Sequence, residues 1–258
     1  MQAELEHAVR GRTPIRRSRR GLRVAGWSMV WTGVLLLGTV AWTLFGTAVI
    51  ADAAQSDLED RLVETWAQRP LPANAPAPAI ADGPLPSNDS EEAQQAEPAV
   101  VEEAAVAPGE PVGRISIPTA GVDWVVVEGV DPEDLKQGPG HMPWTPLPGQ
   151  PGNAVISGHR TTYGAPFLDL DLVEIGDEIM VETALGAHVY TVRESFVVEP
   201  TDVWVTDPRP GAWLTLTTCT PRYSAARRLI IAAELTSGPN HAAVQELYEP
   251  AEKYDLAS

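Results

Sequence analysis

One cysteine, Cys219, offers the chain a nucleophile, and it ends the segment WLTLTTC directly before TPRYS. A cysteine that closes an apolar run and is followed by a proline and a loop is placed at the rim of a strand. A thiol with a pKa of about 8.5 is only partly ionised at neutral pH, so a nucleophilic cysteine needs a neighbouring base. Free cysteines also serve as buried packing residues, and the alternative interpretation makes Cys219 an inert core thiol.

Two of the five histidines stand where they could serve that thiol. His159 follows the apolar run AVI at a strand end, with Gly158 leaving room beside it, whereas His141 lies in the loop GPGHMP. Spacing alone favours His159 over His141. The others are predicted to be a cytoplasmic residue, a solvated turn residue and a residue of a polar tail: His7, His188 and His241.

Acyl transfer also needs a group that stabilises the developing oxyanion. Arg227 and Arg228 begin the apolar run RRLIIAAEL, eight and nine residues after Cys219. A strand–loop–strand return of that length brings one of them back beside the thiol. The register decides which one, because neighbouring side chains of a strand point to opposite faces. The alternative for either residue is a surface cation on an edge strand.

Three motifs resemble sortases. TLTTCTP is similar to the TLxTC signature of that family, and the spacing from its cysteine to Arg-Leu-Ile-Ile is similar to the family's C…R motif. The stretch LKQGPGHMPWTPLPGQPGNAVISGHRTTYGAPF resembles sortase sequence leading to the catalytic histidine. The resemblance covers about residues 112–236, and TTYG after His159-Arg160 is most similar to class E, the housekeeping sortases of actinobacteria.

The resemblance implies a role for each matching residue. Cys219 takes the place of the nucleophile, His159 that of the catalytic histidine and Arg228 that of the arginine. The expected substrate-binding residues are Thr218, which matches the residue thought to shape the oxyanion site, and Tyr163, which matches a tyrosine that reads the sorting signal. His141 becomes a structural histidine.

The implied reaction is covalent transpeptidation of a sorting signal of the LAxTG or LPxTG kind. The thiolate attacks the Thr carbonyl, the Gly amine leaves, and an amine of a lipid-linked cell-wall precursor or a pilin lysine resolves the acyl-enzyme. The expected partners are therefore surface proteins with a sorting signal, that precursor and the membrane. The acidic ladder that some class A sortases use for calcium is not evident, so no cofactor and no metal are expected.

The rest of the chain predicts five parts. Residues 1–23 form a basic cytoplasmic N-terminus and residues 24–50, which carry no charge, a transmembrane helix. Residues 51–111 hold a juxtamembrane helix and a disordered linker rich in Pro, Ala and Glu. Short alternating runs over 112–236 predict an all-β domain, and the resemblance implies a closed barrel of about eight strands with short helices. Residues 237–258 form a polar tail.

Charge sets the expected orientation and excludes one class of function. Seven Arg precede the apolar stretch and acids follow it, so the positive-inside rule places the N-terminus in the cytoplasm and the catalytic domain outside the cell. A net charge of −17 argues against a nucleic-acid binder. One cysteine excludes an intrachain disulfide.

Four alternatives remain open at this stage. The apolar stretch could be a cleaved signal peptide, although it is longer than the usual apolar region. The enzyme could be a pilin-polymerising sortase of class C or D, although the linker carries no DPW or DPF lid motif. An L,D-transpeptidase has a His-Gly pair before its cysteine, where this chain has Thr217-Thr218. The last alternative is a tethered β domain without catalysis.

Overall fold

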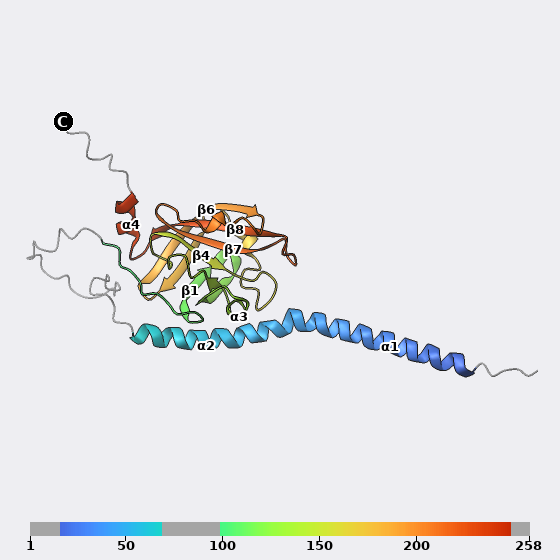
Figure 1. The fold of residues 1–258 in the computed structure, drawn as a ribbon. Coiled ribbons are helices and arrows are strands. Elements are labelled where there is room, and N and C mark those ends of the chain that lie inside the picture. Colours follow the sequence, from blue (N-terminus) through green and yellow to red (C-terminus); the bar gives the residue numbers. More distant parts are fainter. Residues whose placement is uncertain (1–15, 69–98, 249–258) are drawn as a thin grey trace, which may run out of the picture. The chain divides into compact units, whose positions relative to one another are not determined.

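The computed structural model describes residues 16–68 and 99–248, and the chain divides into two compact units, residues 1–44 and 45–258 (Figure 1). The predictions for residues 1–15, for most of the Pro-rich linker and for the end of the polar tail lie outside the described residues.

The first unit is dominated by helix α1, Arg16–Ala41. Within the described residues, Arg20–Ala41 is the one helical stretch long and apolar enough to cross a membrane, with a mean hydropathy of 1.6. Its 22 residues match the length that a bilayer core requires. The helix therefore starts before the predicted residue 24, and residues 47–50 of the predicted span belong to the next helix.

The second unit contains a β-barrel (Figure 1). The barrel is closed, and its strand order is β1-β2-β3-β4-β7-β8-β6-β5. Only the β2–β3 and β4–β7 pairs are parallel. The predicted all-β fold with about eight strands is thus confirmed. The strands are β1 Pro111–Ile117, β2 Val122–Glu128, β3 Gly140–His141, β4 Gly152–Ser157, β5 Glu178–Thr183, β6 Gly186–Val198, β7 Ala212–Thr220 and β8 Arg227–Ser237.

Short helical segments connect these strands, as the sequence predicts. They are the 3-10 turns Pro118–Ala120, Leu170–Leu172 and Val203–Thr206 and helix α3, Pro132–Leu135, while helix α4, His241–Tyr248, follows the last strand. Asp131 and Asp134 form a capping box at the start of α3, which satisfies N–H groups that a helix start leaves free.

The barrel interior is filled by alternate side chains of each strand. Strand β5 alternates between exposed and buried positions along its whole length, and Leu214 and Leu216 of β7 are fully buried. Because successive side chains of a strand point to opposite faces, the residues between them face outward. On β7 the outward-facing Thr215 and Thr217 are buried as well, so the strand becomes accessible near its end, at Cys219 and Thr220.

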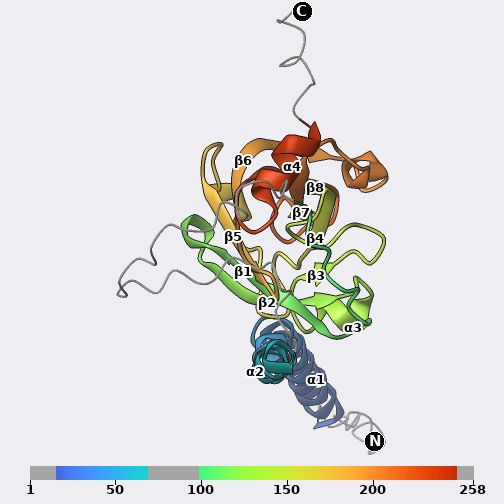
Figure 2. The ribbon, with the colours of Figure 1, turned by 90° about the vertical axis from the view of Figure 1, so that its left-hand side faces the viewer.

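Helix α2, Thr47–Gln68, lies along the outside of β2 and follows α1 after the π-helical segment Trp42–Gly46 (Figure 2). The helix predicted after the apolar stretch is present and is longer than expected. Its residues Leu58 and Leu62 pack with Val125 and Val127 in a small apolar cluster separate from the barrel interior. The cluster explains why an amphipathic helix stays on the barrel wall.

A side chain of α2 completes the hydrogen bonding of β2 where the two-residue β3 is too short to pair with it. Gln55 accepts a bond from the N–H of Val125 at 2.8 Å and donates to the Val125 carbonyl at 3.0 Å and the Gln137 carbonyl at 2.9 Å. The Gln55 amide thus takes the place of a peptide group of a neighbouring strand.

Residues 99–110, which the sequence assigns to the linker, lie against the barrel. Val100 and Val106 pack on its core, and the Val101 N–H donates to Asn240 Oδ1 at 2.9 Å. Asn240 is fully buried, and its amide also donates to the carbonyls of Val101 and Gly149, each at 3.0 Å. The sequence did not predict this packing, because the segment has few apolar residues and Pro, Ala and Glu dominate its surroundings.

Candidate active site

Cys219 is a half-buried free thiol near the end of β7. In the antiparallel β7–β8 ladder it stands directly opposite Arg228, whereas Arg227 stands opposite Thr220. Directly opposed residues share one face of the sheet, with Cβ atoms about 4.5–5.5 Å apart. The register therefore puts Arg228, and not Arg227, on the face that carries Cys219, and Arg228 is the residue that the resemblance favours.

The backbone at the end of the hairpin holds the Arg228 guanidinium. Its Nη1 donates to the carbonyls of Ala225 and Arg227, each at 3.1 Å. Arg227 itself is exposed and lies 3.5 Å from Glu199. Of the two arginines, Arg228 is the one that lies opposite Cys219 and is less exposed.

His159 reaches the same end of the barrel from β4. Strands β4 and β7 are parallel neighbours with Ser157 opposite Thr217, and the Gly158 N–H continues the ladder to the Thr217 carbonyl at 3.1 Å. His159 and Cys219 each lie two residues beyond that pair, so both side chains leave adjacent strands at one level. Burial lowers the pKa of the His159 imidazole below its usual value.

Thr218 lies beneath this surface. Its side chain is buried on the face of β7 opposite to Cys219, and its hydroxyl donates to the Gly158 carbonyl at 2.8 Å. A Cβ on Gly158 would lie 2.6 Å from the ring of Phe167, so the position accepts no larger residue without movement. Thr218 and Gly158 together tie the end of β7 to the backbone that carries His159.

Tyr163 stands beside the imidazole. The ring centroids of Tyr163 and His159 are 5.2 Å apart with a tilt of 34°. Tyr163 and Ala165 have positive φ angles of 51° and 50°, and Gly164 between them has 72°. The left-handed region is costly for non-glycine residues, and such residues gather at functional sites. The loop is therefore held in an unfavourable backbone conformation.

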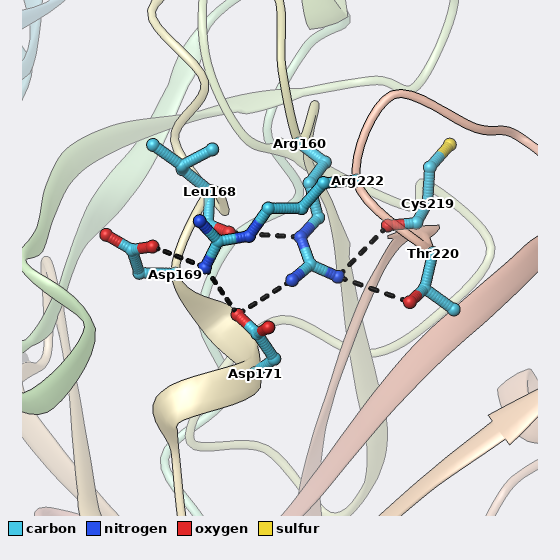
Figure 3. A network of polar contacts seen from close by, with 7 residues as sticks. All are labelled: Arg160, Leu168, Asp169, Asp171, Cys219, Thr220 and Arg222. Atoms are coloured by element: carbon cyan, nitrogen blue, oxygen red, sulfur yellow. Dashed lines mark hydrogen bonds and ion pairs between the residues drawn. The ribbon is translucent and has the colours of Figure 1, made fainter.

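Arg160 is a buried cation of this region whose place the sequence analysis did not predict (Figure 3). Its Nε donates to the Leu168 carbonyl at 3.0 Å, and its Nη1 donates to the Cys219 carbonyl at 3.4 Å and to Thr220 Oγ1 at 3.3 Å. Its Nη2 lies 2.7 Å from Asp171. Through its guanidinium, Arg160, which directly follows His159, therefore binds the main chain of Cys219.

Two carboxylates and a second arginine extend this network toward the surface. Arg222 Nη2 donates to Asp169 at 2.7 Å and to Asp171 at 3.1 Å. Partial desolvation opposes ionisation of Asp171, but the hydrogen bonds and charges of Arg222 and Arg160 outweigh it and hold the Asp171 pKa below its usual value. The pairing of these residues depends on how the loop folds back, for which the sequence has no periodic signal.

Two other histidines are buried away from this cluster. His141 Nδ1 lies 2.7 Å from Glu128 and its Nε2 lies 3.0 Å from the Pro146 carbonyl, which fits the structural role expected of it. The prediction that His188 is a solvated turn residue was wrong, because it is fully buried in β6. A Cβ on Gly149 would lie 2.2 Å from its ring, so a glycine opposite makes the space for it.

Within residues 16–68 and 99–248, no group of three or more His, Cys, Asp or Glu side chains is placed to hold a metal ion. The candidate site brings together the thiol of Cys219, the imidazole of His159 and the guanidinium of Arg228. These three groups at the ends of adjacent strands make the protein a candidate cysteine enzyme.

Comparison with known proteins gives the family. Residues 115–236 match the family model described as the sortase domain. The chain is 29% identical over 225 residues to sortase SrtE1 of Streptomyces coelicolor, which covers 81% of this chain and 55% of that protein. Sortase SrtE2 of the same organism is 25% identical and covers 87% of this chain and 85% of that protein. The chain belongs to the sortase family.

Solved structures similar to this chain include a sortase E variant from Streptomyces avermitilis. It is 36% identical, with a TM-score of 0.47, and the match covers 51% of this chain and 91% of that one. A sortase D5 transpeptidase from Clostridium perfringens is 32% identical, with a TM-score of 0.48, covering 51% of this chain and 82% of that one. The chain spans about half of the length of SrtE1.

Proposed function

We propose that the protein is a membrane-anchored sortase that cleaves a sorting signal of the LAxTG or LPxTG kind between Thr and Gly and transfers the new carboxyl end to a cell-wall amine. The observation that carries the proposal is the pairing of Cys219 with Arg228 across the β7–β8 ladder. A nucleophile and an oxyanion-stabilising cation on one face of one hairpin are the two groups that acyl transfer requires first.

In the first step the Cys219 sulfur forms a bond to the Thr carbonyl carbon, and the carbonyl oxygen takes the negative charge beside Arg228. Collapse of this adduct breaks the Thr–Gly C–N bond, and the His159 imidazolium gives its proton to the leaving amine. In the second step the acceptor amine loses a proton to His159 and displaces the sulfur as thiolate. The sum of the two steps exchanges one amide for another.

The lowered pKa of His159 bears on this mechanism. Because burial disfavours the charged ring, only a minority of the molecules carry the imidazolium at neutral pH. That minority form is a strong acid toward the leaving amine. Burial thus makes the imidazolium less abundant and a stronger acid.

The apolar helix supports the membrane part of the proposal. Arg20–Ala41 has the length of a membrane anchor, and the Arg-rich segment before it is the flank that the positive-inside rule keeps in the cytoplasm. The barrel then lies outside the cell, where surface proteins and a lipid-linked wall precursor meet the same membrane. Tethering raises the effective concentration of both for the enzyme.

The test uses the full chain in detergent or nanodiscs with LAxTG and LPxTG peptides and a set of amine acceptors. Wild-type protein is expected to cleave at the Thr–Gly bond and to join the N-terminal fragment to the amine, as mass spectrometry reports. Cys219→Ala is expected to lose all turnover, since the sulfur forms the intermediate. A trapped thioester of the peptide on Cys219, absent from Cys219→Ala, would identify that intermediate.

The outcomes also separate the alternatives. Transfer only to a lysine side chain of a pilin-like acceptor would indicate a pilin-polymerising sortase. A protein that binds wall ligands equally well as wild type and as Cys219→Ala, without cleaving peptide, would be a β domain without catalysis and would refute the proposal.

A further inference from the structure

The Tyr163 loop does not stand alone beside the imidazole, because helix α2 touches it. The Tyr163 N–H donates to Thr47 Oγ1 in the first turn of α2 at 3.1 Å, although the two residues are 116 positions apart. Thr47 is buried, with 9% of its surface exposed. A buried acceptor provided by another element is a contact that the loop would lose if α2 moved away.

A second contact lies one residue further along the loop. A Cβ on Gly164 would lie 2.3 Å from the Trp124 ring of β2 and 3.4 Å from the Cβ of Ala51 in α2. Ala51 is fully buried. The backbone of the loop thus passes closely between the barrel wall and the second turn of the helix, where only glycine fits.

The same face of α2 carries both its loop contacts and its anchors to the barrel. Thr47, Ala51 and Gln55 recur every four residues, and Leu58 and Leu62 continue the stripe. Residues at this spacing share one helix face. The contacts of Gln55 with the β2 backbone and the apolar cluster therefore fix the position of Thr47 as well.

The loop has a reason to need this support. The positive φ angles of Tyr163 and Ala165, on either side of Gly164, cost free energy, and they persist only where the surroundings hold them. The Tyr163 ring that results lies against His159. Without Thr47 as acceptor, the part-buried Tyr163 N–H would favour conformations in which it reaches water.

We propose that docked α2 positions the Tyr163 loop and that Thr47 is the positioning residue, so that the helix following the membrane segment is part of the substrate-binding site. Thr47 is separated from the apolar helix by only the segment Trp42–Gly46. The helix that follows the proposed membrane anchor thus also sets the position of the Tyr163 ring beside His159. The kinetic part of this inference rests on the proposed sortase function.

The test compares full-length Thr47→Val and Thr47→Ser with wild type in detergent. Valine keeps the shape of threonine and removes the acceptor, whereas serine retains it. We expect backbone amide exchange at residues 163–165 to accelerate about tenfold in Thr47→Val, the scale of one net hydrogen bond. The KM for the sorting peptide should rise severalfold with a smaller change in kcat, and Thr47→Ser should restore both values.

Ser56→Ala is the matched control, because Ser56 is exposed on α2 and its hydroxyl bonds only within the helix, to the Asp52 carbonyl at 3.1 Å. If Thr47→Val exchanges at residues 163–165 as slowly as Ser56→Ala, the inference is overturned whatever the kinetics show. If wild type cleaves no peptide, the proposed function fails, and the exchange measurement still decides whether α2 positions the loop.

Discussion

The buried guanidinium of Arg160 links the two halves of the candidate site. It follows His159 in the chain and binds the main chain at Cys219, while Asp171 balances its charge. Figure 3 shows the Cys219 carbonyl turned toward Arg160 and the sulfur turned away from it. A buried cation with fixed partners adds little net stability, but it fixes geometry. We therefore expect Arg160 to act on the spacing between imidazole and thiol.

Arg160→Lys tests this role because lysine keeps the charge and loses the planar fork. The variant should fold, since an ammonium can still pair with Asp171. Its kcat should fall by about 10²-fold, the cost of a misplacement of about 1 Å, with little change in KM. Steady-state kinetics on the sorting peptide measures both.

Arg193→Lys is the control for Arg160→Lys. Arg193 pairs with Glu234 at 3.0 Å on the exposed surface of β6 and β8, so its replacement should leave both kinetic constants unchanged. Equal kinetics in the two variants would show that Arg160 has no positioning role.

His188 makes stability depend on pH. Its burial lowers its pKa to about 4, against 6.5 for an accessible histidine. Between these values the unfolded chain binds the proton more tightly, so stability is present above pH 6.5 and is lost as pH falls toward 4. The full loss is about 3 kcal/mol.

His188→Phe should remove this part of the pH dependence, because phenylalanine does not titrate. Urea unfolding at pH 7 and pH 4.5 gives the free energy of unfolding of wild type and variant at each pH. The change between the two pH values is expected to be smaller in the variant. An equal change in the free energy of unfolding for wild type and variant would mean that His188 is accessible or already charged in the folded protein.

At the scale of the element, the ends of β4, β7 and β8 position the three side chains of the candidate site. Thr218 illustrates this, since its buried hydroxyl bridges from β7 to the Gly158 carbonyl directly before His159. A strand ladder is rigid because every residue is held on two sides, so a bond between two strand ends controls the direction in which both side chains leave.

Thr218→Val should cost about 1–3 kcal/mol, because the Gly158 carbonyl is left without its buried donor. It should also lower kcat, as the His159 backbone is released. Thr236→Val is a matched comparison, since Thr236 makes a similar bond to the Val189 carbonyl at 3.2 Å on a distant part of the barrel. Loss of stability in both variants with loss of activity in neither would contradict the bridging role.

The elements also show what a sequence can predict. The alternating runs and the motif around Cys219 predicted the strands and the two residues at their ends, because both depend on local pattern. Spacing alone left Arg227 and Arg228 open, the resemblance favoured Arg228, and the register of the ladder gives the physical reason to separate them. The bond from Tyr163 to Thr47 and the pairing of Arg160 with Asp171 join loops to distant segments, and no period in the sequence encodes such contacts.

At the scale of the whole molecule, the described ends of the barrel domain are fastened to each other. Asn240, just before α4, bonds to both backbone groups of Val101 and to the Gly149 carbonyl. One buried side chain thus closes the segment before β1 and the segment after β8 onto the same loop.

Asn240→Ala should lower the free energy of unfolding by about 2 kcal/mol, since the buried Gly149 carbonyl and the half-buried Val101 N–H lose this partner, whereas the Val101 carbonyl still accepts from Gln150 Nε2 at 3.0 Å. Limited proteolysis should then cut within residues 99–110 sooner than in wild type. An unchanged urea midpoint together with unchanged cleavage would show that these bonds do not hold the segment.

The Gln55 amide has a consequence for anyone who produces this domain. A shortened version that begins after residue 68 would uncover the Val125 N–H and carbonyl, and with them the one stretch of β2 that a two-residue neighbour leaves unpaired. Exposed strand edges recruit other strands. Such a preparation should self-associate in solution, and its dimers should dissociate when a peptide covering residues 47–68 is added back.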